Sequence, residues 1–203
     1  YMARRISKPI VQLAKEIDRI KKFQLDHKIT VKSYIKEIRQ ITHAVISMKN
    51  AIQSFSYFVP KQIVEKLVVK GRNVRLGGET KRLTIFFSDI TDFAGLSEGL
   101  HSEELMLHIS AYLDQLSTVI MEKSGTIDKY IGDSIMAFWG APDEDPQDAL
   151  HAAQAALECQ RKLSELNTTW QAEGKPPLFT RIGIHKGDVI VGNIGTSERM
   201  NYT

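Results

Sequence analysis

Two aspartates stand where apolar, strand-like stretches of this sequence end. The first stretch, residues 83–87, leads directly to Asp89, and the second, residues 126–131, ends on Gly132 and Asp133. A third stretch follows at once, so the Gly-Asp pair predicts a tight hairpin turn. A lone aspartate at the end of a strand is more often a turn or cap residue. If the strands share one sheet, however, Asp89 and Asp133 can lie side by side at its edge, where two hard carboxylates suit Mg²⁺ or Mn²⁺.

The residues around these aspartates form an ordered set of motifs. Residues 87–93 read FxDIxxF, and residues 129–140 read KxxGDxxMAxxG. Downstream, residues 181–195 read RIGIHKGDVIVGNIG, and residues 200–203 read MNYT. Over roughly residues 80 to 203 the chain therefore resembles the catalytic domain of class III nucleotidyl cyclases. Because the family's pattern continues beyond Thr203 with an Asn and an Arg that stabilise the transition state, we expect this domain to be incomplete at its C-terminus.

The hydrophobic pattern of this region alternates between strand and helix. This β-α-β-β-α-β order predicts an α+β, ferredoxin-like sheet with the helices on one face. Pro146, after Asp145, is expected at the first position of its helix, and His101 precedes a helix with acids in its first turn. We expect strands at 83–89, 126–132, 134–140, 179–186 and 188–194, and helices at 92–98, 102–123 and 146–170.

Several polar or glycine-rich features are expected to be structural. Gly187, Gly192 and Gly195 lack the Lys-Ser/Thr of a P-loop, so we interpret them as hairpin glycines. His185 on its strand is expected to be a hydrogen-bonded core histidine. The acidic cluster 143–145 is expected to be an exposed loop and helix cap.

The composition of the 203 residues is that of an ordinary globular protein without an 18-residue apolar run. The single cysteine, Cys159, excludes an internal disulfide and a cysteine-based zinc cluster, and its helical period predicts a buried thiol. Residues 1–82 carry 19 Lys and Arg against 6 Asp and Glu, whereas residues 83–203 carry 8 against 18. No nucleic-acid recognition motif accompanies the basic half, so a position beside an anionic membrane surface explains it better.

Residues 1 to 55 are strongly periodic and predict two helices. Between them, residues 23–33 have no helical period and are long enough, when extended, to start a second helix parallel to the first. With Pro9 early and Glu16 late in the first helix, this arrangement resembles a HAMP signalling module; a plain dimerising coiled coil is the alternative. The two seams, whose apolar residues step by three and four, are Ile6, Ile10, Leu13, Ile17 and Ile20, then Ile35, Ile38, Ile41, Val45, Met48, Ile52 and Phe55.

The seams are each about two heptads long, too short to be stable alone, so the helices must share a core with a partner chain. HAMP modules usually follow a transmembrane helix, which would put the cluster Arg4, Arg5 and Lys8 at the cytoplasmic face of the cell inner (plasma) membrane. Residues 56–79 are expected to connect this module, residues 1–55, to the catalytic domain, residues 80–203, through a short helix and a glycine-containing loop.

The cyclase resemblance implies a reaction and its metal site. A cyclase brings the ribose 3′ hydroxyl of ATP onto its own α-phosphorus and expels pyrophosphate, with two divalent cations, Mg²⁺ or Mn²⁺, to activate the hydroxyl and neutralise the phosphates. Asp89 and Asp133 are the expected bridging ligands, and the Ile90 carbonyl is the third ligand that the resemblance implies. Phosphate oxygens are expected to bind the backbone amides that lead into the next helix, at Thr91, Asp92, Phe93 and Ala94.

Two further positions are those at which the family reads the purine. Lys129 can donate to adenine N1, whereas guanylate cyclases use an acid to accept from guanine. Thr203 occupies the second base-reading position, where many adenylate cyclases have Asp, and threonine there marks the class IIIb subgroup. Together, Lys129 and Thr203 indicate that the substrate is ATP and not GTP. Asp188 departs from the mammalian relatives, which can carry an arginine there for the phosphates.

We therefore expect an adenylate cyclase that acts as a homodimer, with the metal aspartates on one catalytic domain and the base-reading residues on the other. One alternative is a guanylate cyclase or an enzyme of dual specificity, which Lys129 disfavours. A diguanylate cyclase is disfavoured because its glycine-rich acidic signature is missing. The third alternative is a catalytically silent module that binds nucleotide and relays a signal, which the retention of Asp89 and Asp133 disfavours.

Overall fold

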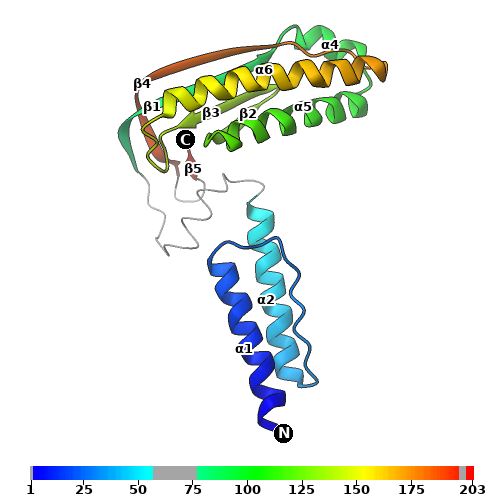
Figure 1. Ribbon diagram of the computed structural model, residues 1–203, viewed down its shortest axis with the longest axis vertical. Coiled ribbons are helices and arrows are strands. Elements are labelled where there is room, and N and C mark those ends of the chain that lie inside the picture. Colours follow the sequence, from blue (N-terminus) through cyan, green and yellow to red (C-terminus); the bar gives the residue numbers. More distant parts are fainter. Residues whose placement is uncertain (1, 57–76, 197–199) are drawn as a thin grey trace. The chain divides into compact units, whose positions relative to one another are not determined.

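The computed structural model describes residues 2–56, 77–196 and 200–203 (Figure 1). The chain divides into two compact units, residues 1–75 and 76–203, and each is described by itself. Of the predicted connecting helix and loop, residues 57–76 lie outside the described residues, whereas residues 77–79, predicted as loop, belong to a β-strand. Within the described part of the chain, no helix is long and apolar enough to cross a membrane.

The first unit is a pair of parallel helices, α1 (Met2–Lys21) and α2 (Lys36–Phe55), joined by the predicted extended connector, which runs back along them (Figure 1). The Glu16 carboxylate of α1 contacts His27 of the connector and so ties the connector to the helix. The apolar core of this unit draws on both helices and the connector. It consists of Leu13, Ile20, Phe23, Leu25, Ile29, Ile38 and Val45.

Only part of each predicted seam is buried within the chain. In α2, for example, Ile38 is 5% exposed and Ile41 is 52% exposed, although both belong to the same seam. One chain therefore covers one line of apolar side chains and leaves another uncovered. We call the uncovered set the exposed seam residues: Ile6, Ile10, Ile17, Ile41, Met48 and Phe55.

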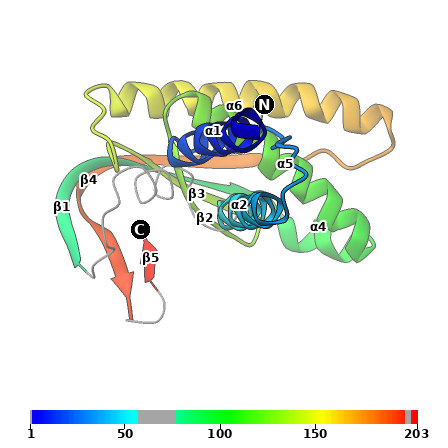
Figure 2. The ribbon, with the colours of Figure 1, turned by 90° about the horizontal axis from the view of Figure 1, so that it is seen from below.

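The second unit is a five-stranded antiparallel sheet in the order β2-β3-β1-β4-β5, which confirms the predicted α+β class. Figure 2 shows its long strands curving at one end toward β5. The strands are β1 (Gly77–Ile90), β2 (Thr126–Ile131), β3 (Ser134–Trp139), β4 (Thr180–Gly195) and β5 (Met200–Tyr202). The helices are α4 (Phe93–Gly99), α5 (Ser102–Glu122) and α6 (Asp148–Ala172).

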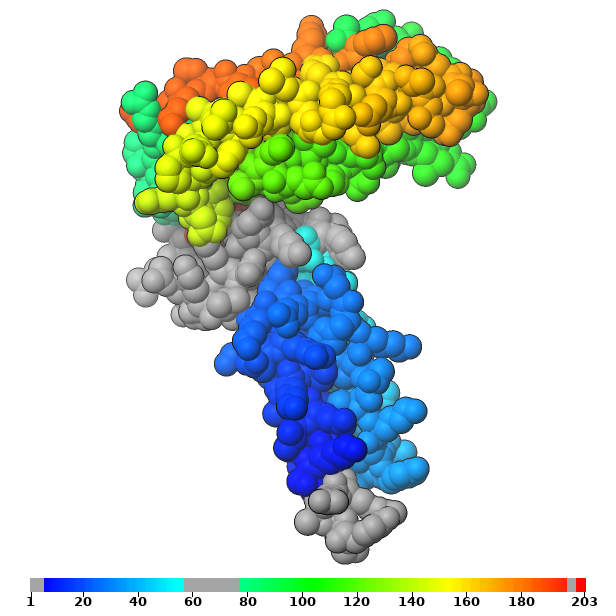
Figure 3. Space-filling view, in the orientation of Figure 1, coloured from blue at the N-terminus to red at the C-terminus, as the bar shows by residue number. Residues whose placement is uncertain are grey.

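Helices α5 and α6 cover one face of this sheet, as predicted, and lie side by side (Figures 1 and 3). Alternate strand residues such as Phe86 and Trp139 point into this layer, because successive strand side chains face opposite sides. Tyr112 of α5 and Cys159 of α6 pack against them, and burial raises the pKa of the Cys159 thiol to about 12. The other face, which we call the open face, carries Ile85, Phe87 and Asp89 of β1, because these residues alternate with the buried ones.

The prediction of two strands at 179–186 and 188–194 was wrong, because β4 is one continuous strand that pairs with the whole of β1. Gly187 is therefore not a hairpin glycine but lies opposite Leu83 in the middle of the ladder. At Gly192 a side chain would collide with β1, since a Cβ there would lie 2.3 Å from the Gly77 carbonyl oxygen. Glycine is needed at this position for close strand approach.

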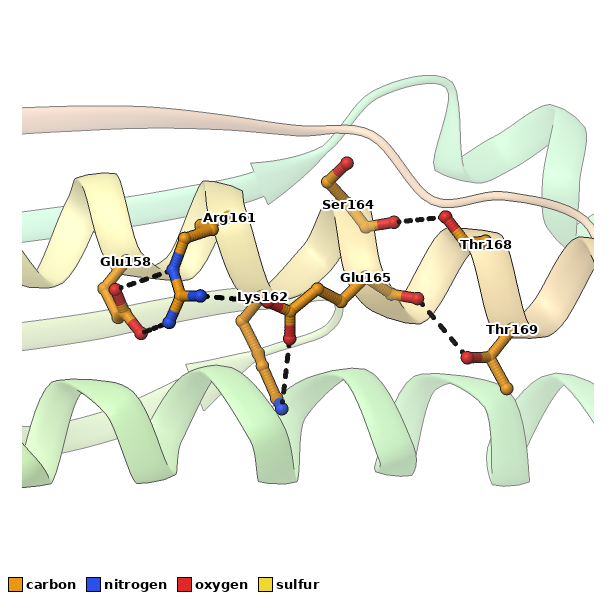
Figure 4. A network of polar contacts seen from close by, with 7 residues as sticks. All are labelled: Glu158, Arg161, Lys162, Ser164, Glu165, Thr168 and Thr169. Atoms are coloured by element: carbon orange, nitrogen blue, oxygen red, sulfur yellow. Dashed lines mark hydrogen bonds and ion pairs between the residues drawn. The ribbon is translucent and has the colours of Figure 1, made fainter.

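Helix α6 begins two residues later than predicted, so Pro146 precedes the helix. The N-cap is Gln147, which makes no side-chain cap hydrogen bond, so the predicted cap at Asp145 was wrong. Asp145 instead lies in the turn before the helix, where its carboxylate accepts hydrogen bonds from the Gln147 amide (2.9 Å) and from His151 Nδ1 (2.7 Å). On the outward side of α6, ion pairs join Arg161 to Glu158 and Glu165 one turn apart (Figure 4). Exposed pairs of this kind add little stability, so the apolar inner face holds α6 in place.

Candidate active site

The structure brings Asp89 and Asp133 together at one end of β1. The strand pairing puts Ser88 opposite Ile135, so the turn that follows β2 lies beside the last residues of β1. Asp133 Oδ2 accepts a hydrogen bond from the Ile90 amide at 2.9 Å, and Ser134 Oγ lies 3.5 Å from Asp89 Oδ1. Gly132 has φ of 63°, which a tight Gly-Asp hairpin requires.

A third charged group lies at this end of the sheet. Arg181 is paired with Asp89 across the β1–β4 ladder, and its guanidinium contacts Asp89 Oδ2. The Arg181 side chain is 71% exposed and the Asp89 side chain 47% exposed, so both remain accessible to water. No local sequence pattern predicts this contact, because the two residues are 92 positions apart and only the register of β4 against β1 brings them together.

The residues at this edge fit a hard divalent cation, although not a site built from protein side chains alone. Among the described residues, no group of three or more His, Cys, Asp and Glu side chains could hold a metal ion. Two carboxylates and a main-chain carbonyl supply oxygen ligands of the kind that Mg²⁺ and Mn²⁺ prefer, and such sites commonly take further ligands from substrate phosphates and water. The predicted ligands Asp89, Ile90 and Asp133 do lie together.

The segment after Asp89 turns sharply into the short helix α4. Asp92 adopts a left-handed conformation with φ of 55° and stands at the helix N-cap. The Thr91 amide is already used, because it donates to the Phe179 carbonyl oxygen at 2.7 Å. Because the first amides of a helix have no acceptor within it, the amides of Asp92, Phe93 and Ala94 are better suited to hold an anion than that of Thr91.

The two predicted base-reading residues also lie together, although they are 74 positions apart in the sequence. Lys129 Nζ on β2 donates to Thr203 Oγ1 at 3.2 Å. Thr203 is held by two backbone hydrogen bonds with Gly192, of 3.0 and 3.1 Å. Asp128, which the sequence analysis did not identify, also contacts these residues. Its Oδ2 atom accepts a hydrogen bond from Thr203 Oγ1 at 2.6 Å.

His185 and Asp188 are two further residues of β4 that the sequence analysis named. His185 was predicted to be a core histidine, and that was wrong: it lies exposed on the open face, opposite Ile85. The error arose because an apolar strand pattern does not tell which of its faces a helix layer covers. Asp188, opposite Arg82, is likewise exposed.

Comparison with known proteins identifies both units. Residues 78–203 match the family of adenylate and guanylate cyclase catalytic domains, and residues 1–54 match the HAMP domain family. The chain thus belongs to the class III nucleotidyl cyclases. More particularly, it joins a catalytic domain of the adenylate and guanylate cyclase family to an N-terminal HAMP domain.

Its relatives include adenylate cyclase 1 of Rhizobium meliloti (strain 1021), which is 35% identical over 202 residues. That alignment covers 100% of this chain but 30% of the relative, so this chain spans less than a third of that protein's length. Two solved structures, the adenylyl cyclase CyaB from P. aeruginosa and the guanylyl cyclase Cya2, each align with 39% identity and a TM-score of 0.60. They cover 63% of this chain, and the alignments include 67% and 65% of those chains, respectively.

Proposed function

We propose that the protein is an adenylate cyclase that converts ATP to 3′,5′-cyclic AMP and pyrophosphate. The observation that carries this proposal is the contact between Lys129 Nζ and Thr203 Oγ1, which puts an ammonium donor beside a hydroxyl oxygen. Adenine offers an acceptor, N1, beside a donor, the N6 amino group, so this pair matches its edge. The name of the Rhizobium relative supports the same substrate.

The paired carboxylates suit the chemistry of this reaction. We propose that Asp89, Asp133 and the Ile90 carbonyl hold two divalent cations, Mg²⁺ or Mn²⁺, which when bound make the ribose 3′ hydroxyl more acidic and offset the triphosphate charge. The Ile90 amide keeps the Asp133 carboxylate turned toward β1, at 2.9 Å, and Ser134 lies against Asp89. Phosphoryl transfer of this kind depends chiefly on positioning and charge, so no covalent nucleophile is needed.

The amides that follow Asp89 are the proposed contacts of the phosphates. Asp92, Phe93 and Ala94 form the entry to α4, where N–H groups and the helix dipole favour negative charge. Phe93 also packs against the apolar core, which fixes the position of these amides relative to the sheet. Thr91, tied to Phe179, supports this turn through its backbone.

The active unit is proposed to be a homodimer, with the metal aspartates of one chain facing Lys129 and Thr203 of the other. Large apolar side chains remain uncovered on the open face of the sheet, where Phe87 is 46% and Ile131 is 52% exposed. The exposed seam residues of α1 and α2 are a second uncovered set. Apolar surfaces of this kind mark interaction sites.

We further propose that the chain works at the cytoplasmic face of the cell inner (plasma) membrane, anchored by a transmembrane segment that precedes the HAMP domain. The support is the excess of 19 Lys and Arg over 6 Asp and Glu in residues 1–82. A basic segment is attracted to anionic lipid headgroups. Immunoblotting of separated membrane and soluble fractions tests this; recovery in the soluble fraction alone would contradict it.

Turnover of ATP and, separately, GTP by the full-length protein with Mn²⁺ tests the proposed reaction. We expect cyclic AMP from ATP, little product from GTP, and loss of at least about a hundredfold in kcat for Asp89→Asn and for Asp133→Asn, because each removes a charged metal ligand. Asp114→Asn, on the exposed side of α5, is the matched control. Production of cyclic GMP in preference would favour the guanylate cyclase, and no cyclic product from a folded dimer would favour the silent relay module.

A further inference from the structure

Asp128 is the extra residue of a β-bulge between β2 and β3. Ile127 pairs with Ala137 and Lys129 with Met136, so Asp128 has no partner of its own in the ladder. Bulges bend a strand and redirect side chains, and they are frequent beside active sites. Here the Asp128 side chain is 2% exposed. A carboxylate is rarely so buried unless its charge is hydrogen-bonded, so its partners need explanation.

The partners of Asp128 are the two proposed base-reading residues. Its Oδ2 atom accepts a hydrogen bond from Thr203 Oγ1 at 2.6 Å and lies 3.4 Å from Lys129 Nζ. The third side of this triangle is the hydrogen bond of 3.2 Å from Lys129 Nζ to Thr203 Oγ1. Asp128 thus contacts both groups at once, from a position that leaves the Lys129 side chain 40% exposed.

This geometry fixes which way the Thr203 hydroxyl can bond. A hydroxyl has one proton to donate and two lone pairs that accept. The carboxylate of Asp128 can only accept, so the Thr203 proton is committed to it, and one lone pair is used by Lys129. What remains for a ligand at Thr203 is an acceptor. Lys129, with three N–H donors, keeps at least one for a ligand.

An acceptor beside a donor discriminates between the purines. Adenine carries a donor, the N6 amino group, next to the acceptor N1, whereas guanine carries the acceptor O6 next to the donor N1–H. A Thr203 hydroxyl that was free to rotate could donate to guanine O6 as readily as it accepts from adenine N6. With its proton committed, it faces guanine O6 with a lone pair.

We propose that Asp128 is a specificity-determining residue, which makes the site select adenine by holding the Thr203 hydroxyl as an acceptor. It acts on base selection through Thr203 and is a positioning residue. The inference rests on the proposed adenylate cyclase function and deepens it, since a threonine alone does not have a fixed hydrogen-bond polarity.

The test is Asp128→Asn in the full-length protein, with kcat/KM measured for ATP and for GTP. The asparagine is nearly isosteric and can donate to Thr203, which frees the hydroxyl proton to rotate toward a ligand. We expect the ratio of kcat/KM for ATP to that for GTP to fall about tenfold or more, mainly through KM, because base contacts of this kind discriminate strongly. Asp114→Asn is the matched control, and the melting temperature reports whether the fold survives.

A double variant separates this role from general support of the fold. In the Thr203→Val protein, which has no hydroxyl at position 203, adding Asp128→Asn should not change the ATP-to-GTP ratio further. A merely structural residue would instead be equally damaging in the wild-type and the Thr203→Val protein. The same ratio can be read without turnover, from calorimetric binding of 3′-deoxy-ATP and 3′-deoxy-GTP. If the wild-type protein makes cyclic AMP but Asp128→Asn keeps the wild-type ratio, the role of Asp128 is refuted. If the wild-type protein makes no cyclic product, the proposed function itself fails, and an unchanged binding ratio then also refutes the role of Asp128.

Discussion

Asp89 lies between two neighbours of different kinds, the Ser134 hydroxyl and the Arg181 guanidinium. A guanidinium stabilises the ionised carboxylate, but a divalent cation bound to the same carboxylate would experience its positive charge as repulsion. Both side chains are partly exposed, so water screens this repulsion and its effect is modest. We therefore expect Arg181 to lower the affinity of the proposed metal site modestly.

Replacing Arg181 should strengthen metal binding. For Arg181→Gln we expect the Kd for Mn²⁺ to fall about threefold at low ionic strength, because the positive charge that repels the cation is removed. The change should be smaller at high salt, because salt already screens this repulsion in the wild-type protein. Electron paramagnetic resonance of free Mn²⁺ measures the affinity directly. Arg161→Gln, on the outer face of α6, is the control and should leave the Kd unchanged. A weaker or unaltered affinity in Arg181→Gln would show that the ion pair does not compete with the metal.

At the scale of the elements, one buried carboxylate joins α6 to the sheet. Asp148, in the first turn of α6, accepts hydrogen bonds from Thr84 of β1 at 3.0 Å and from Lys186 of β4 at 2.5 Å. Burial by itself would raise the pKa of Asp148, but the bonds from Lys186, the Ala149 amide and Thr84 outweigh it and lower the pKa below its usual value. The charged form therefore stabilises the fold.

Asp148→Asn should destabilise the catalytic unit in a pH-dependent way. Because the pKa is lower in the folded than in the unfolded chain, the stabilisation is complete above the unfolded pKa and is lost as the pH falls through the folded one. Denaturant unfolding at pH 7 should show that the free energy of unfolding falls by about 1–3 kcal/mol. We do not expect a larger loss, because the Lys186 side chain is 39% exposed and water weakens its ion pair with Asp148. The difference from wild type should shrink toward pH 3. An equal difference at both pH values would rule out a charge effect.

The local sequence predicted most elements but not every connection between them. The pair Gly-Asp occurs at residues 132–133 and again at residues 187–188. A hairpin was predicted at the first pair, and Gly187 of the second was also interpreted as a hairpin glycine. Only the first is a hairpin, because β4 pairs with the full length of β1 and extends straight through Gly187. The period-2 pattern of β1 and the helical period of α5 and α6 gave the sheet and its helix layer, since each depends on residues close in sequence.

The polar residues of the candidate site differ in the same way: those marked by a local pattern could be predicted, and those placed by contacts between distant segments could not. Asp89 and Asp133 were predictable because each ends an apolar run. Asp128 was not, because its role depends on Thr203, which lies 75 residues away, and on a bulge that periodicity does not reveal. Arg181 was missed for the same reason, since only the strand register puts it beside Asp89.

At the scale of the whole molecule, the proposed dimer depends on the surfaces that a single chain leaves uncovered. The exposed seam residues are spaced for a coiled-coil-like core, and Ile41 and Met48 are separated by one heptad. Charges at these two positions should oppose association, because they would have to be buried in the shared core.

We expect Ile41→Asp with Met48→Asp to weaken dimerisation at least about tenfold and to lower the specific activity at dilute protein concentration. Sedimentation velocity over a range of concentrations measures the association. The control replaces two exposed polar residues of the same helix, Arg39→Asp and Asn50→Asp, and should leave both properties near those of wild type. An unchanged dimer in the apolar-to-acid variant would show that these helices do not form the interface.

The most direct measurement is complementation between two inactive variants. Asp89→Asn removes a proposed metal ligand, and Lys129→Met removes the proposed base donor, so each homodimer should make almost no cyclic AMP from ATP. If every site is built from Asp89 of one chain and Lys129 of the other, a mixed dimer contains one intact site. Co-expression in equal amounts should then restore about a quarter of the wild-type activity, because half of the dimers are mixed and each has one working site of two. Mixed dimers that form but remain inactive would contradict a shared site.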